Sequence, residues 1–173
     1  MDKDELIGAL REVDEELSSP CDVVLVGGAS MILHFGASRA TRDVDALFLR
    51  GDTAELRRAI REVSRKHDLP EAWMNDAVKG FAEVLSRDFY HRLVPLDLQF
   101  KHLRLYVLGR AEQVAMKVVA LREQDRKTWS CSHARCRTTI AVDWLRSLSS
   151  WQSRSDWAQK IHYFMLEQGW KTE

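Results

Sequence analysis

The spacing of apolar residues predicts an amphipathic helix at the start of the chain. Apolar residues recur there every three or four positions, with charged residues between them: Leu6, Ile7, Leu10, Val13 and Leu17. This period places them on one buried helical face. Asp2 or Asp4 is a suitable N-cap for the helix, and Ser18-Ser19-Pro20 ends the pattern.

Two short apolar runs then predict strands. They extend from Asp22 to Val26 and from Val44 to Leu49, and the continuous Val and Leu content of the first is typical of a strand covered on both faces. Between them, residues 29–35 predict a short helix that ends near Gly36. After the second run, residues 51–53 turn into a helix with a buried stripe at Leu56, Ile60 and Val63.

Between Leu93 and Leu108 the pattern changes to an alternation of apolar and polar residues. Leu96, Leu98 and Phe100 fall on one face, and the polar residues between them, Asp97, Gln99 and Lys101, fall on the other. The extended pattern continues over residues 103–107 and predicts a hairpin. Before it, Asn75 or Asp76 is expected to cap a short helix. After it, helical patterns cover residues 110–124, 138–148 and 155–168.

The order of these elements predicts an α/β or α+β fold with a mixed β-sheet flanked by helices and a helical C-terminal portion. A chain of 173 residues can bury one good core. We therefore expect a domain over residues 1–127, with a helical extension over residues 128–173 packed on it.

Composition narrows the class of protein. Lys plus Arg equals Asp plus Glu at 26 each, so the chain lacks the basic excess of many nucleic-acid binders, although a local basic patch is compatible with this balance. Its three cysteines are unevenly placed, which argues against a secreted disulfide scaffold. The acidic start does not fit a signal peptide, and no apolar run is long enough to cross a bilayer. We expect a soluble cytoplasmic protein with no membrane partner.

A glycine pair and an aspartate pair carry the most specific chemistry. Gly27 and Gly28 close the first apolar run, and Asp43 and Asp45 open the second. Glycines let backbone N–H groups approach phosphate oxygens. Carboxylates two residues apart on a strand share one face, so both can hold the same divalent cation. The combination suits phosphate chemistry assisted by Mg²⁺ or Mn²⁺.

These residues resemble the signature of the polymerase-β-type nucleotidyltransferase superfamily. The fuller run, residues 27–30 followed by residues 39–45, is similar to small prokaryotic nucleotidyltransferases related to the toxins of abortive-infection toxin–antitoxin systems. Residues 69–81 and the lysine-bearing stretch 115–125 are similar to segments typical of one subgroup of them. The resemblance covers about residues 6–127, and it implies a nucleotidyltransferase-like fold.

The resemblance implies roles for the two pairs. The backbone at Gly27 and Gly28, together with the Ser30 hydroxyl, would hold the β- and γ-phosphates of a nucleoside triphosphate. Asp43 and Asp45 would bind Mg²⁺, which neutralises phosphate charge and activates the acceptor oxygen.

Further residues complete the implied site. Asp97 is the candidate for a third metal-binding carboxylate, because it lies on the polar face of the next predicted strand. Lys117 would face the phosphates. Asp125 lies roughly 12 Å further along that helix, where it would orient the lysine or assist removal of a proton from the acceptor.

Phosphate contacts are also implied by the residues that precede the aspartate pair. Arg39 and Arg42 flank Thr41, and all three are implied to contact the nucleotide, since guanidinium groups are suited to binding phosphate oxygens. Trp73 is interpreted as a packing residue in preference to a platform for base stacking.

Two functions follow from the resemblance. The first is an Mg²⁺-dependent enzyme that moves a nucleotidyl group from a nucleoside triphosphate to a hydroxyl of RNA, tRNA or a protein, as a toxin-like component with an antitoxin partner. The alternative is a non-catalytic module on the same fold that binds a nucleotide or a partner. Thr128 favours the alternative, because relatives often carry a second aspartate three residues after the one that matches Asp125.

Overall fold

The computed structural model describes residues 1–38, 40–76, 85, 89–109 and 112–113. The chain divides into two compact units, of which the first comprises Met1–Gly80 and Arg92–Leu108 and the second comprises Phe81–His91 and Gly109–Glu173. All strands and α-helices described below belong to the first unit. A short 3₁₀-helix, η1 (Phe89–Arg92), spans the point in the sequence where the second unit gives way to the first. The predicted domain boundary after residue 127 and the predicted helices beyond residue 113 lie outside the described residues.

The first unit is an α+β fold built on a mixed five-stranded sheet, as the sequence predicts. Its strands, in the spatial order β3-β2-β1-β5-β4, are β3 (Met74–Asn75), β2 (Val44–Arg50), β1 (Cys21–Leu25), β5 (Leu103–Val107) and β4 (Val94–Leu96). The central strand β1 runs antiparallel to β2 and parallel to β5. β3 pairs with β2 in parallel, and β4 pairs with β5 in antiparallel.

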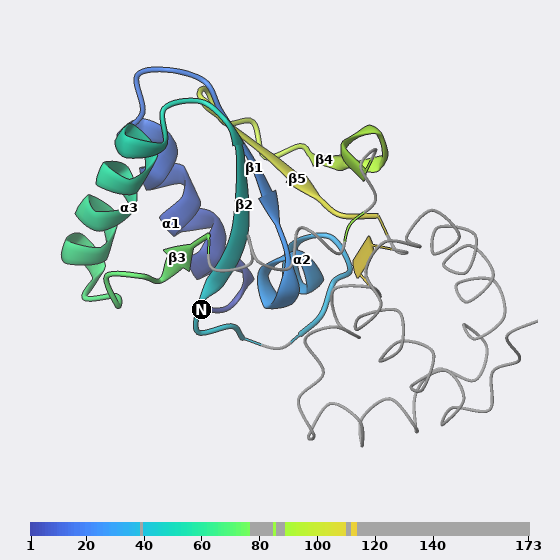
Figure 1. The fold of residues 1–173 in the computed structure, drawn as a ribbon. Coiled ribbons are helices and arrows are strands. Elements are labelled where there is room, and N and C mark those ends of the chain that lie inside the picture. Colours follow the sequence, from blue (N-terminus) through green and yellow to red (C-terminus); the bar gives the residue numbers. More distant parts are fainter. Residues whose placement is uncertain (39, 77–84, 86–88, 110–111, 114–173) are drawn as a thin grey trace, which may run out of the picture. The chain divides into compact units, whose positions relative to one another are not determined.

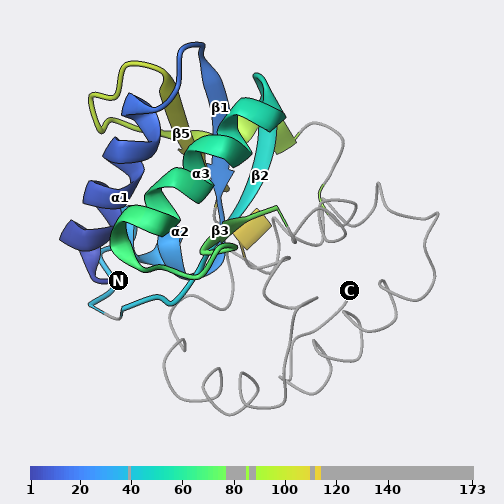
Figure 2. The same ribbon diagram turned by 90° about the vertical axis from the view of Figure 1, so that its left-hand side faces the viewer.

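Three α-helices accompany the sheet. α1 (Lys3–Glu15) and α3 (Thr53–His67) lie side by side against one face of the sheet, and α2 (Gly27–Leu33) follows β1 directly (Figures 1 and 2). The predicted cap of α1 is Asp2, whose carboxylate accepts the N–H groups of Asp4 and Glu5 while the Glu5 side chain accepts the N–H of Asp2. Such a reciprocal cap satisfies backbone donors that the first turn leaves unpaired.

The hydrophobic core lies between this helix pair and the sheet. The predicted helix faces and the alternate strand positions are buried in it, including Leu6, Leu10, Val13, Val23, Leu25, Val44, Ala46, Leu56, Ile60, Val63, Leu103, Leu105 and Val107. Val24 and Val26, on the opposite face of the sheet, are buried as well. The prediction that the first strand is covered on both faces is confirmed.

Trp73 is a packing residue, as interpreted from the sequence. It is 1% exposed, and its indole N–H donates to the backbone carbonyl of Ile60 at 3.1 Å. A buried indole usually needs such an acceptor. The contact joins the segment after α3 to the helix itself.

The structure departs from two sequence predictions about local structure. Met74 and Asn75 form strand β3, so Asn75 does not cap a helix, and the helix that Asp76 would cap lies outside the described residues. The backbone is extended there because it pairs with the start of β2, where the Val44 N–H donates to the Trp73 carbonyl at 2.6 Å. In addition, β4 ends at Leu96, and the expected alternation through Lys101 is replaced by a loop.

The loop between β4 and β5 leaves the ladder for two reasons. Gln99 adopts a left-handed conformation with φ of 54°, which interrupts an extended chain. Further on, the carboxylate of Asp14 on α1 accepts the N–H groups of Lys101, His102 and Leu103 at 2.8, 2.6 and 2.6 Å. Asp14 is only 6% exposed, so one buried carboxylate fixes the end of the loop against α1.

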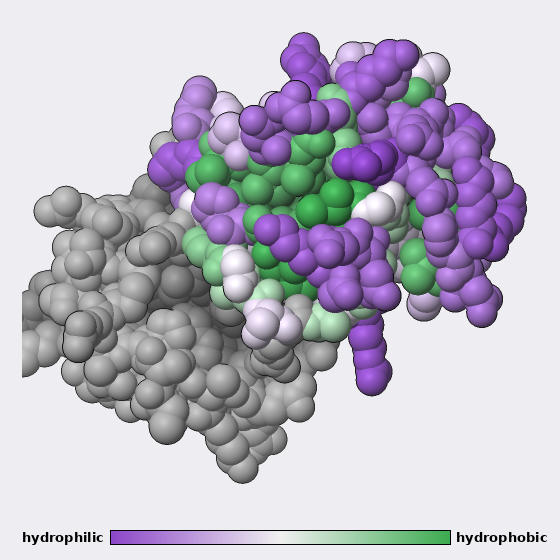
Figure 3. All heavy atoms as spheres, turned by 180° about the vertical axis from the view of Figure 1, so that it is seen from behind, coloured by the Kyte–Doolittle hydropathy of each residue, from purple (hydrophilic) through white to green (hydrophobic). Residues whose placement is uncertain are grey.

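On the face seen from behind, the surface of the described part is mostly hydrophilic (Figure 3). In the view from behind, apolar side chains gather between hydrophilic ones (Figure 3). Leu49 and Tyr90 are the exposed large hydrophobic residues of the described part, at 42% and 54%. None of its helices has the length and apolar character needed to span a membrane.

Candidate functional site

Asp45 lies directly against the turn made by the first glycine of the pair. A Cβ built on Gly27 would lie 3.2 Å from Oδ2 of Asp45, and Gly27 has a φ of +58°, a conformation that side chains disfavour. The backbone also joins the two segments, because the Val26 N–H donates to the Asp45 carbonyl at 2.9 Å. The antiparallel pairing of β1 with β2 therefore places the glycine pair, which follows β1, beside Asp45 near the start of β2.

The second glycine lies against Thr41. A Cβ on Gly28 would lie 2.6 Å from Thr41 Oγ1 and 3.2 Å from Thr41 Cβ, so no residue with a side chain fits there unless Thr41 moves. The Thr41 hydroxyl donates to the backbone carbonyl of Asp43 at 2.8 Å. The space over the glycine pair is thus bordered by the Asp45 carboxylate and the Thr41 hydroxyl.

The other predicted residues of these segments differ in exposure. Asp43 and Arg42, which immediately precede β2, are exposed. Ser30 is fully buried, and its hydroxyl donates to the carbonyl of Gly27 at 2.9 Å. In this structure Ser30 supports the glycine turn from within α2, because its hydroxyl proton is directed to the turn.

The sheet places an amide beside Asp45 that the sequence analysis did not assign to the site. Parallel pairing of β2 with β3 sets Asn75 in register with Asp45. Paired residues on neighbouring strands point to the same face of a sheet, so the two side chains share a face. The next residue, Asp76, instead forms an ion pair with Arg57 of α3 at 2.9 Å. The sequence pattern does not reveal Asn75 as a neighbour of Asp45, because β3 has just two residues and only its pairing with β2 brings the two together.

The prediction that Asp97 provides a third metal-binding carboxylate was wrong. Asp97 follows β4, which β1 and β5 separate from β2, a lateral distance of roughly 14 Å at the usual strand spacing. Ala46, the residue after Asp45, lies level with Val94 of β4 through successive strand pairs across the sheet. Asp97 is three residues beyond Val94, so it lies toward the end of the strands opposite to Asp45. One Mg²⁺ cannot span that gap, since its ligands lie about 2.1 Å away.

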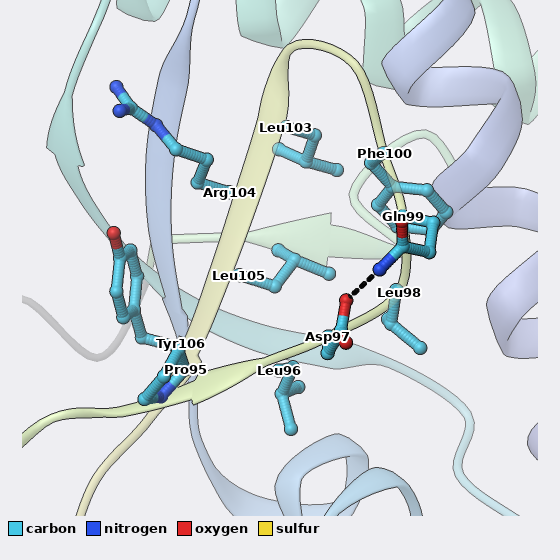
Figure 4. A pocket seen from close by; sticks show the side chains of 10 residues that line it. All are labelled: Pro95, Leu96, Asp97, Leu98, Gln99, Phe100, Leu103, Arg104, Leu105 and Tyr106. Atoms are coloured by element: carbon cyan, nitrogen blue, oxygen red, sulfur yellow. Dashed lines mark hydrogen bonds between the residues drawn. The ribbon is translucent and has the colours of Figure 1, made fainter.

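Asp97 instead belongs to the loop between β4 and β5. Its carboxylate accepts a hydrogen bond from the side-chain amide of Gln99, and both residues line a cavity of about 300 Å³ between the loop and β5 (Figure 4). The backbone of Gln99 is left-handed, and the Gln99 side chain points back toward Asp97.

Three predicted site residues, Arg39, Lys117 and Asp125, lie outside the described residues. In the described part of the chain, no group of three or more His, Cys, Asp and Glu side chains is arranged to hold a metal ion. The candidate site there consists of the glycine turn, Asp43, Asp45 and the neighbouring Asn75.

A family model described as "Nucleotidyltransferase of unknown function (DUF6036)" matches residues 4–171, nearly the whole chain. The chain belongs to this family. The sequence resemblance to a small nucleotidyltransferase is thereby confirmed. No curated protein and no solved structure matches the chain.

In this nucleotidyltransferase-family chain, the donor atoms around the glycine turn suit a hard cation. Asp43 and Asp45 supply carboxylate oxygens, and Asn75 supplies an amide that is on the same sheet face as Asp45. Mg²⁺ is commonly held by one or two carboxylates together with substrate phosphates. The residues therefore fit Mg²⁺ or Mn²⁺ held jointly with a substrate better than a metal enclosed by protein ligands alone.

Proposed function

We propose that this protein transfers a nucleotidyl group from a nucleoside triphosphate to an acceptor hydroxyl, with Mg²⁺ or Mn²⁺ as cofactor. The observation that supports the proposal most is the contact between the Asp45 carboxylate and the Gly27 turn. A glycine turn, of the kind that lets a backbone approach phosphate, and a carboxylate suited to a cation meet at one place. Membership of the nucleotidyltransferase family agrees with this reading.

The charges that would meet at the turn favour a bound cation. A phosphate that approaches Gly27 meets the negative charge of Asp45, and two like charges 4 Å apart repel by roughly 4 kcal/mol near a protein surface. Mg²⁺, when bound, supplies the positive charge that offsets this repulsion and stabilises the charge that develops on the phosphates. Binding of the triphosphate should therefore depend on the metal.

The proposed reaction has a defined balance of bonds. The acceptor oxygen forms a bond to the α-phosphorus, and the bond from that phosphorus to the oxygen shared with the β-phosphate breaks. Pyrophosphate leaves with the electron pair, and the hydroxyl proton passes to a base. Asp43 and Asp45 would hold the cation, Arg42 and Arg39 would contact phosphate oxygens, and Lys117 and Asp125 keep the roles proposed for them from the sequence.

Calorimetry with each nucleoside triphosphate, with and without Mg²⁺, tests the proposal. We expect binding of at least one triphosphate in the presence of Mg²⁺ and a loss of at least about tenfold in affinity without it, because Asp45 then repels the phosphates. Incubation of the protein with each labelled triphosphate, Mg²⁺ and total RNA, followed by a gel, then tests transfer. Binding that is equally strong without metal would contradict the proposed site.

The second candidate function is a module that binds nucleotide or a partner without catalysis. Asn75 favours it, because the strand next to Asp45 carries an amide where a further carboxylate would strengthen a metal site. An amide oxygen is neutral and contributes less charge to the cation than a carboxylate does.

The variant Asn75→Asp tests whether position 75 belongs to the cation site. The added charge beside Asp45 is expected to raise the affinity for Mn²⁺ about tenfold, since affinity rises with the charge of the ligands. Titration of the protein with Mn²⁺, followed by electron paramagnetic resonance, measures this affinity. Asn75→Leu, which is similar in size and adds no carboxylate, is the matched control and should not raise this affinity. Equal Mn²⁺ affinity in Asn75→Asp and the unaltered protein would place Asn75 outside the site.

The acceptor and the partner also belong to the proposal. We propose RNA, tRNA or a protein as the source of the acceptor hydroxyl, a toxin-like role with an antitoxin partner, and a cytoplasmic setting. Four basic residues of α3 are poor candidates for binding RNA, because they form ion pairs with carboxylates: Arg57, Arg58, Arg65 and Lys66. An RNA contact would instead involve Arg42 and the basic residues outside the described part.

A further inference from the structure

Thr41 makes two contacts that link the glycine turn to the aspartate pair. Its hydroxyl donates to the carbonyl of Asp43 at 2.8 Å. Its Oγ1 and Cβ also occupy the space beside Gly28, 2.6 and 3.2 Å from where a Cβ would stand. A single side chain therefore contacts both halves of the candidate site.

The main chain of Thr41 is fixed by a separate set of hydrogen bonds. Its N–H donates to the carbonyl of Met1 at 2.9 Å, and its carbonyl accepts from the nitrogen of Met1 at 2.5 Å. Met1 directly precedes the cap of α1. The backbone of Thr41 is thus held by the start of α1, and its side chain is held between Gly28 and Asp43.

In each residue of the acidic segment, residues 43–45, a hydrogen bond holds a backbone atom in place. The Asp43 carbonyl accepts from Thr41, the Val44 N–H donates to the Trp73 carbonyl, and the Asp45 carbonyl accepts from the Val26 N–H. The last two anchors belong to strand pairing. The first uses a side chain, so it can be removed without deleting any bond of the sheet.

We infer that Thr41 is a positioning residue, which fixes Asp43 relative to the glycine turn and does not itself contact the substrate phosphates. A hydroxyl has one proton to donate, and the Thr41 proton is directed to Asp43. This inference rests on the proposed function, because Asp43 is positioned there for a divalent cation. It replaces the role of phosphate contact that the sequence resemblance implies for Thr41.

Thr41→Val and Thr41→Ser test the inference. Valine keeps the shape of the side chain and removes the donor, and serine keeps the donor. We expect the Mn²⁺ affinity, measured without nucleotide, to fall about fivefold to tenfold in Thr41→Val, the equivalent of a hydrogen bond worth about 1 kcal/mol. Thr41→Ser should stay within about twofold of the unaltered protein. Thr53→Val, at the first residue of α3, is the matched control and should behave like the unaltered protein.

A direct phosphate contact predicts a different pattern. In that case Thr41→Val would keep its Mn²⁺ affinity and raise only the KM for the triphosphate, which would overturn the inference. A melting curve for each variant verifies that any change does not reflect unfolding.

Hydrogen exchange separates this inference from the proposed function. Without metal, the amides of residues 43–45 should exchange faster in Thr41→Val than in Thr41→Ser or the unaltered protein, because one anchor of that segment is lost. Equal exchange in all three proteins would overturn the positioning role. Faster exchange in a protein that binds no Mn²⁺ would support the positioning role and contradict the proposed cation site.

Discussion

Asp45→Asn is expected to reduce nucleotidyl transfer by about a hundredfold to a thousandfold. The substitution keeps the size of the side chain that lies against Gly27 and removes its negative charge. A neutral amide holds Mg²⁺ weakly, and loss of one group that stabilises developing charge commonly costs a hundredfold to a thousandfold in rate. The measurement is incorporation of labelled nucleotide under saturating Mg²⁺ and triphosphate. We expect Asp43→Asn to lose activity similarly, since the pair acts on one cation.

The matched control for this prediction is Asp68→Asn. Asp68 follows α3 in a left-handed conformation with φ of 50°, which asparagine also adopts readily. The control makes the same chemical change at an exposed position remote from the glycine turn, and it should keep full activity. Transfer that persists in Asp45→Asn within about tenfold of the unaltered protein would remove Asp45 from the mechanism.

Asp14→Ala is expected to lower the free energy of unfolding by about 3–5 kcal/mol. The substitution leaves the N–H groups of Lys101, His102 and Leu103 without their shared acceptor. Hydrogen bonds to a charged acceptor are stronger than neutral ones, and burial at 6% exposure keeps water from replacing the carboxylate fully. Urea unfolding measures the change, and Asp4→Ala in the exposed first turn of α1 is the control. A loss below about 1 kcal/mol in Asp14→Ala would contradict the anchoring role.

The same carboxylate should make stability depend on pH. Burial raises the pKa of Asp14, but the N–H donors of Lys101, Leu103 and His102 outweigh burial and lower the pKa below its usual value of 3.8. The unfolded chain then binds the proton more tightly than the folded one, so stability rises with pH through this range. The contribution of Asp14 is complete above the unfolded pKa and is lost as the pH falls through the folded pKa. The stability difference between the unaltered protein and Asp14→Asn should therefore shrink below about pH 4. A difference that stays constant down to pH 2 would contradict the lowered pKa.

The sequence by itself determined the elements whose cause is local. The three-to-four residue period of Leu6 to Leu17 and of Leu56 to Val63 required amphipathic helices, and the structure has both. Continuous Val and Leu content required a buried strand at the first apolar run, and the second apolar run predicted the other strand that the structure has. The glycine and aspartate pairs were also recognisable, because residue type and spacing alone indicate their chemistry. The glycines allow backbone access to phosphate, and the aspartates supply oxygen ligands two residues apart.

Only the tertiary structure decided which residues are neighbours. Strand order and register arise from pairing between distant segments, and no local period reveals them. Asp97 was a plausible partner for Asp45 along the chain, yet two strands separate them, whereas Asn75 on a two-residue strand lies in register with Asp45. The hydrogen bonds of Asp14 and Thr41 likewise depend on segments that meet after folding. The sequence specifies the charge and size of each side chain. Its hydrogen-bonding partners are determined only when distant segments of the chain come together in the fold.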